Sequence, residues 1–97
     1  LQGRGRVYEP ADDAFTKMRG LFPEAPGVRS IVRVAVERVS GSCGFGVPLF
    51  QHEGDRRHLL DWADRKGEQG LRHYQRDKNH VSIDGLPALR WTEDVTV

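Results

Sequence analysis

The sequence has a single cysteine, no long apolar run and almost no excess of charge. One cysteine, Cys43, excludes a disulfide within the chain and suits a reducing cytoplasm. No apolar stretch approaches the roughly 20 residues that cross a membrane. Fifteen Lys and Arg against fourteen Asp and Glu leave no basic excess, whereas a nucleic-acid surface would show a basic stripe. We therefore expect neither a membrane nor a nucleic-acid partner.

The sequence also lacks the spacings that mark metal and nucleotide sites. The four histidines, at 52, 58, 73 and 80, form no i, i+4 pair and no cysteine spacing suited to zinc. No Gly-Lys-Ser/Thr is present, and the glycine order does not match a dinucleotide fingerprint. We therefore expect no metal, and no residue is a compelling catalytic acid or base.

Ninety-seven residues are enough for at most one domain, 1–97, with a modest core. The chain begins at Leu1 rather than Met, and we expect it to be a piece of a longer protein. Residues 1–51 favour strands with one helix, and residues 52–97 favour helices. The pattern predicts an α+β fold.

The first half predicts a strand–helix–strand unit. Leu1 to Glu9 alternates as a strand, with Arg4 and Arg6 on one face and small residues on the other. Pro10 ends that strand, and Asp12 or Asp13 is a suitable N-cap for a short apolar-striped helix that stops at Pro23.

Ser30 to Val39 is the clearest strand in the chain. Its β-branched residues favour a pleated surface, and we expect one face, formed by Val32, Val34 and Val36, to be buried. Val47 to Gln51 predicts either a short third strand, restricted to a sheet edge by its proline, or an extended arm.

The second half has helical periodicity. We expect helices over Asp55–Lys66 and Glu68–Lys78, separated by Gly67 as a left-handed C′ residue. Trp62 and Tyr74 fall on the apolar stripes and are predicted core residues. Beyond them, residues 82–89 predict a turn, and residues 90–97 a tail that is ordered only if something covers it.

A glycine-rich loop, Gly41 to Gly46, follows the clearest strand and is the candidate site. Its residues allow two interpretations, a bend between strands or a wall against a planar cofactor or a subunit neighbour. Cys43 within it would need a nearby histidine to act as a nucleophile, and we expect a buried, inert thiol. Arg4 and Arg6 suit either a bound phosphate or an exposed, salt-bridged face.

Four segments resemble one protein family in the order in which they occur. They are Val-Glu-Arg-Val, Ser-Cys-Gly-Phe-Gly-Val-Pro, Trp-Ala-Asp-Arg-Lys-Gly and Lys-Asn-His-Val-Ser-Ile-Asp-Gly-Leu-Pro. The sequence resembles the C-terminal part of the proteins in one subgroup of pyridoxamine 5'-phosphate oxidase-like flavoproteins. The resemblance implies a partial antiparallel split β-barrel with a C-terminal helical pair, a homodimer, FMN at the subunit interface and an unidentified small-molecule substrate.

The resemblance also indicates which residues would face the cofactor. These are the loop residues and two arginines of the first strand: Ser42, Cys43, Gly44, Phe45, Gly46, Arg4 and Arg6. The main FMN contacts of the family come from an N-terminal half, which would precede Leu1. Three hypotheses follow: part of an FMN-dependent oxidoreductase, a flavin-binding or dimerisation module without turnover, and an interaction domain.

Overall fold

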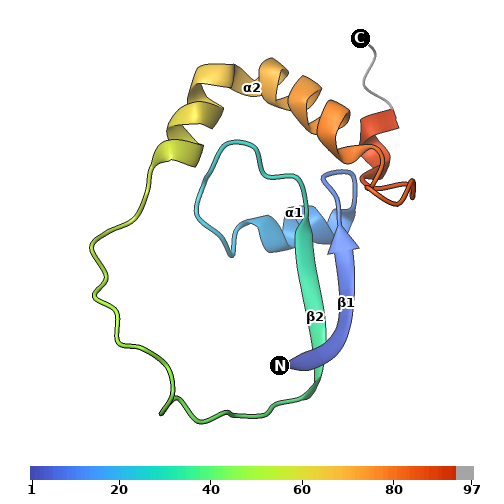
Figure 1. Cartoon of the computed structure of the whole chain (residues 1–97). Helices are drawn as coiled ribbons and strands as arrows, with labels where there is room; N and C mark the ends of the chain where they lie inside the picture. Colours follow the sequence, from blue (N-terminus) through green and yellow to red (C-terminus); the bar gives the residue numbers. More distant parts are fainter. Residues whose placement is uncertain (94–97) are drawn as a thin grey trace.

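The computed structural model describes residues 1–93, which form an α+β fold (Figure 1). The elements follow in the order β1 (Gln2–Tyr8), α1 (Asp13–Arg19), β2 (Ile31–Arg38), α2 (His58–Asn79) and the 3-10 helix η1 (Arg90–Glu93). The strand–helix–strand unit and the helical second half are therefore confirmed. The two predicted strands are correct to within one residue at each end.

The sheet consists of β1 and β2 paired antiparallel, with Arg6 opposite Arg33 and Tyr8 opposite Ile31. Because side chains alternate along a strand, this register separates the sheet into two faces. One, the valine face, carries Gly3, Gly5, Val7, Val32, Val34 and Val36. The other, the arginine face, carries Arg4, Arg6, Tyr8, Ile31, Arg33, Ala35 and Glu37. The predicted alternation is confirmed.

The expectation that the valine face is buried is wrong. Val32, Val34 and Val36 are 61%, 48% and 49% exposed. Alternation determines which residues share a face, but a second layer must cover that face to bury it. The buried hydrophobic residues of the described chain lie elsewhere, at Ile31, Ala63 and Leu71.

The third strand proposed at Val47 to Gln51 is also wrong. From Val39 to Arg57 the chain has no helix or strand, and every side chain is exposed. Figure 1 shows this segment, called the arm below, leaving β2 and running in an open arc to α2. No strand lies beside the arm within residues 1–93, so its backbone has no partner for a β-ladder. The other predicted alternative for Val47 to Gln51, an extended arm, is therefore correct.

α2 begins at His58, three residues after the expected Asp55, and kinks at Gly67, where φ is 66° and ψ is 171°. The predicted break is therefore confirmed. Trp62 and Tyr74, one on each side of it, meet edge to face with ring centres 4.9 Å apart. The ammonium of Lys66 lies 5.3 and 5.6 Å from the two ring centres. Both aromatic residues are half-buried, so they form a surface cluster across the kink and not the core.

The part of α2 that follows Gly67 packs against the segment that leads into β2. Leu71 and Gln75 are buried, and Gln75 Nε2 donates a 2.8 Å hydrogen bond to the carbonyl oxygen of Gly27. Arg29 Nη1 donates to Asn79 Oδ1, also at 2.8 Å. These two hydrogen bonds join segments about 50 residues apart and fix where β2 begins.

We predict that Gly67→Ala destabilises the chain by about 1–3 kcal/mol, because a side chain strains the backbone conformation found there. Gly70→Ala is the matched control, since Gly70 has helical backbone and its added Cβ meets only the Lys66 Cβ, at 3.5 Å. That change should stabilise the helix by about 0.8–1 kcal/mol. Urea unfolding followed by circular dichroism measures both. Equal effects of the two changes would contradict the assigned kink.

We predict that Gly3→Ala weakens the sheet by about 1–3 kcal/mol. A Cβ on Gly3 would collide with the backbone carbonyl of Ala35, beside the irregularity between Gln2 and Gly3. Gly5→Ala is the control, because a Cβ there meets nothing within 4 Å. The same unfolding experiment should leave the Gly5 variant as stable as the parent chain or slightly more so. Loss of stability in the Gly5 variant alone would overturn the register.

Candidate functional site

The glycine-rich loop lies on the exposed arm. Ser42, Cys43, Gly44, Phe45 and Gly46 are all exposed, and the Phe45 side chain is 100% exposed. The expectation of a buried thiol at Cys43 is wrong, because no other part of the described chain packs against the loop to cover it. The Cys43 sulfur accepts a 3.4 Å hydrogen bond from the Phe45 backbone N–H. The loop is therefore accessible to a ligand or another chain.

The two arginines predicted with the loop lie on the arginine face. Arg4 Nε is 3.0 Å from Glu37 Oε1, so Arg4 belongs to an exposed salt bridge. The guanidinium carbon of Arg6 lies 5.4 Å from the centre of the Tyr8 ring. Within residues 1–93, no hydrogen bond or ion pair joins either arginine to the loop. The chain by itself does not bring the predicted cofactor-side residues together.

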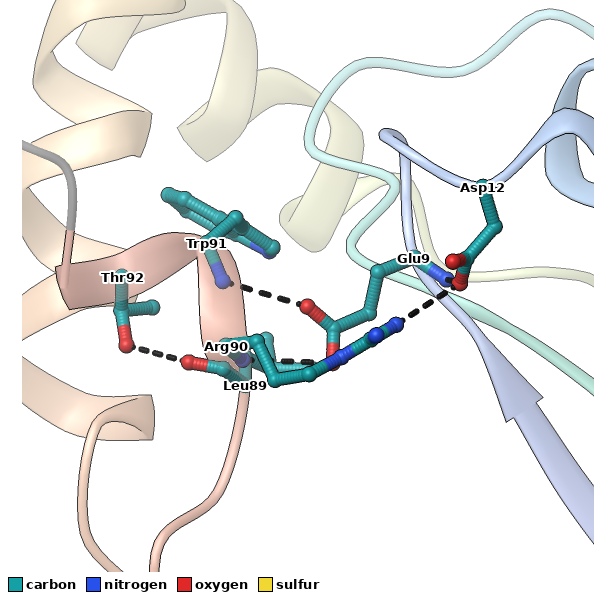
Figure 2. Close-up of polar contacts among 6 residues, drawn as sticks. All are labelled: Glu9, Asp12, Leu89, Arg90, Trp91 and Thr92. Atoms are coloured by element: carbon teal, nitrogen blue, oxygen red, sulfur yellow. Dashed lines mark hydrogen bonds and ion pairs between the residues drawn. The ribbon is translucent and has the colours of Figure 1, made fainter.

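A second cluster, absent from the sequence-based predictions, joins the C-terminal end of β1 to η1. It is formed by Glu9 at the end of β1, Asp12 before α1, and the start of η1 (Figure 2). The Glu9 side chain is only 8% exposed. It accepts hydrogen bonds of 3.2 Å from the Arg90 backbone N–H, from Arg90 Nε and from the Trp91 backbone N–H. A buried carboxylate needs such donors.

Asp12 completes the cluster. Its Oδ2 accepts a 2.8 Å hydrogen bond from the Glu9 backbone N–H and another of 2.8 Å from Arg90 Nη2. The predicted N-cap position is correct, but the Asp12 carboxylate makes no hydrogen bond to α1. It accepts the N–H of Glu9, at the end of β1, instead. The hydrogen bond from the Glu9 N–H and the positive charge of Arg90 lower the pKa of Asp12. Glu9 and Asp12 together raise the pKa of Arg90, and the hydrogen bond to Glu9 is the largest cause.

An open cleft of about 480 Å³ lies beside this cluster. Its lining comes from residues 6–9 and 12–14 in the first part of the chain and from Ala88 and Arg90 in the last part. This volume falls in the range of small-molecule sites, about 300–1,000 Å³. The lining carries the guanidinium groups of Arg6 and Arg90 and the carboxylates of Glu9, Asp12 and Asp13. Because Arg90 is paired with Glu9 and Asp12, the cleft presents no excess of positive charge to a ligand. Within residues 1–93, no group of His, Cys, Asp and Glu suits a metal ion.

Sequence reasoning missed this cluster because its members are 81 residues apart. The one local signal is Glu9, a charged residue placed between a strand and Pro10. Residues 90–97 were expected to be a tail that is ordered only if covered. Residues 90–93 form η1, with Thr92 buried, and Glu9 supplies the contact. The rest of that tail lies outside the described residues.

Comparison with known proteins gives no match: no family model, curated protein or solved structure matches the chain. Among the described residues, no helix is long and apolar enough to span a membrane.

We predict that the chain loses stability as the pH falls through the folded-state pKa of Asp12. That pKa is lowered from its ordinary value of about 3.9. The stabilisation from ionised Asp12 is therefore fully present above the ordinary value and disappears below the folded value. Thermal unfolding between neutral pH and strongly acidic pH measures this.

Two asparagine variants isolate the contribution of Asp12. Asp12→Asn should flatten the acidic limb of the stability curve, because the titrating carboxyl is gone. Asp13→Asn is the matched control, since the exposed side chain of that neighbour makes no hydrogen bond or ion pair within residues 1–93. If both variants keep the acidic limb of the parent chain, the linkage assigned to Asp12 is wrong.

Proposed function

We propose that the chain is the C-terminal part of an FMN-binding flavoprotein of the pyridoxamine 5'-phosphate oxidase-like family. In this proposal, β1 and β2 are two strands of a split barrel that is completed by further strands, and the protein is a homodimer acting on a small molecule. The observation that carries the proposal is the valine face, which is exposed on a sheet that has two strands within residues 1–93.

A sheet of this kind favours completion by other strands. Each of the two strands is an edge strand, with unpaired N–H and C=O groups along one side. Two strands alone are marginally stable in water, and a third strand or a covering layer is needed for independent stability. The Cα radius of gyration, 17.3 Å, also exceeds the roughly 13 Å expected of a compact chain of this length. An added layer of strands would bury Val32, Val34 and Val36.

The arm supplies the proposed cofactor wall. A Cβ built on Gly41, Gly44 or Gly46 meets nothing within 4 Å, so a flat ring has room to approach the backbone there. In the assembled protein, Ser42 to Gly46 would lie against FMN, with Arg4 and Arg6 on the cofactor side. Bound FMN would supply the hydride or electron chemistry. The residues of this chain would bind and orient it.

A second candidate is a flavin-binding or dimerisation module without turnover. The observation that favours it is the exposure of the arm, where Phe45, Leu49 and Phe50 are 100%, 100% and 88% exposed. Large apolar side chains left this exposed would be covered if the arm packed against another chain. Bleaching of bound flavin by added substrates would favour the oxidoreductase over this module.

We predict that the full-length protein, with the N-terminal half that would supply the main FMN contacts, quenches FMN fluorescence on binding. Gly44→Val in that protein should weaken the binding about 10–100-fold by crowding the wall. Gly20→Val is the matched control, because Gly20 also has open space around it but lies at the end of α1. No binding of FMN, or equal weakening in both variants, would overturn the proposed site. Sedimentation of the FMN-bound protein as a monomer would overturn the homodimer.

A further inference from the structure

The valine face has a shallow trough that a bulky apolar side chain would fill. In the register of the sheet, Gly5 lies opposite Val34 and Gly3 lies opposite Val36. Each pair places a valine beside a position without a side chain, and a Cβ built on Gly5 meets nothing within 4 Å. Glycine inside a strand often marks a place where another backbone approaches closely. The trough is therefore shaped to receive another segment of chain.

The arm carries side chains that suit this trough. Residues 39–51 are the longest run of the sequence without Asp, Glu, Lys or Arg, although these four types make up 30% of the residues. Leu49 and Phe50, near the end of this run, are almost fully exposed. The valine face is likewise uncharged. Because burying an unpaired charge is costly, an uncharged segment is the one that can cover an uncharged face.

The arm runs away from the sheet of its own chain. It leaves the end of β2 and follows an open arc to α2 (Figure 1), with every side chain from Val39 to Arg57 exposed. To reach its own valine face, the chain would have to reverse direction within the few residues that separate Val39 from Val47. A second copy related by two-fold symmetry offers an identical face, and each arm can reach it without such a reversal.

The exchange of two arms would bury enough surface for a stable dimer. Each phenylalanine that becomes buried removes about 150–250 Å² from water. Two exchanged arms would contribute Leu49 and Phe50 twice, and the valine faces that receive them would lose a similar area. Stable protein–protein interfaces bury about 1,200–2,000 Å² in total. Two arms on two valine faces therefore reach the lower part of that range.

We propose that residues 47–50 of each copy pack on the valine face of a second copy, in a reciprocal exchange of arms. Consecutive side chains of an extended segment point to opposite sides, so either Leu49 or Phe50 enters the trough beside Gly5. The inference rests on the homodimer of the proposed function and names the surfaces by which the two copies meet. It makes no use of FMN.

Disulfide trapping between two different variants of the full-length protein tests the contact. Every variant also carries Cys43→Ser. One protein has Leu49→Cys or Phe50→Cys in the arm, and the other has Val34→Cys in the valine face. The matched control uses Ala35→Cys in place of Val34→Cys, because that exposed neighbour lies on the arginine face of the same strand. The mixtures are oxidised with diamide, and mass spectrometry identifies the linked peptides.

We expect one of the two arm cysteines to link to position 34 about tenfold or more faster than to position 35, since a disulfide forms only between closely placed Cα atoms. Sedimentation provides a second measurement. Leu49→Ser combined with Phe50→Ser should weaken dimerisation about tenfold or more through lost apolar burial. Leu21→Ser removes an exposed leucine outside the arm and should leave dimerisation unchanged.

Equal linking to positions 34 and 35, or no link to position 34, overturns the inference. A link to position 34 that forms only when both cysteines are in one chain shows an arm folded onto its own sheet and also overturns the exchange. A dimer that the two serine substitutions do not weaken overturns it while leaving the homodimer intact. Formation of the link between copies of a protein that binds no FMN contradicts the flavin proposal alone.

Discussion

The placement of η1 against the end of β1 depends on the buried carboxylate of Glu9. Burying a carboxylate is costly unless donors replace the water it loses. Glu9 receives two backbone N–H groups and the Arg90 guanidinium, and Asp12 shares that guanidinium. Removal of Arg90 would leave a buried charge without its partner, which is more damaging than never having had the pair. The hydrogen bonds therefore specify where η1 lies as well as stabilising it.

Polar contacts have this importance because the apolar core is small. Ile31, Ala63 and Leu71 are its buried hydrophobic members, and Glu9, Gln75 and Thr92 are buried polar residues in equal number. Such a core leaves little hydrophobic free energy to hold α2 against the segment before β2. The hydrogen bond from Gln75 to Gly27 and that from Arg29 to Asn79 fix this contact by their geometry. The sheet, by contrast, gains little from burial of its valine face, where Val34 and Val36 remain about half exposed.

Local patterns predicted the local features of this chain and not the contacts between distant parts. The period of two placed Arg4 and Arg6 on one face and the valines on the other, and Gly67 marked the break in α2. The predicted burial of Val34 and of Cys43 would have required a covering layer, which no local pattern describes. Val47 to Gln51 has strand-like residues but no partner strand within residues 1–93. Glu9 and Arg90 meet across 81 residues, a distance at which residue spacing carries no signal.

The register of the sheet determines which side chains share each of its two faces. A slip of one residue would exchange the faces of a strand, so valines and arginines could not both keep their sides. The irregularity between Gln2 and Gly3 and the close approach of Gly3 to Ala35 resist such a slip. With this register, further strands or a covering layer would use the valine face and the strand edges. Arg4 and Arg6 would remain on the opposite face of the sheet, so a layer that covers the valines leaves both arginines accessible.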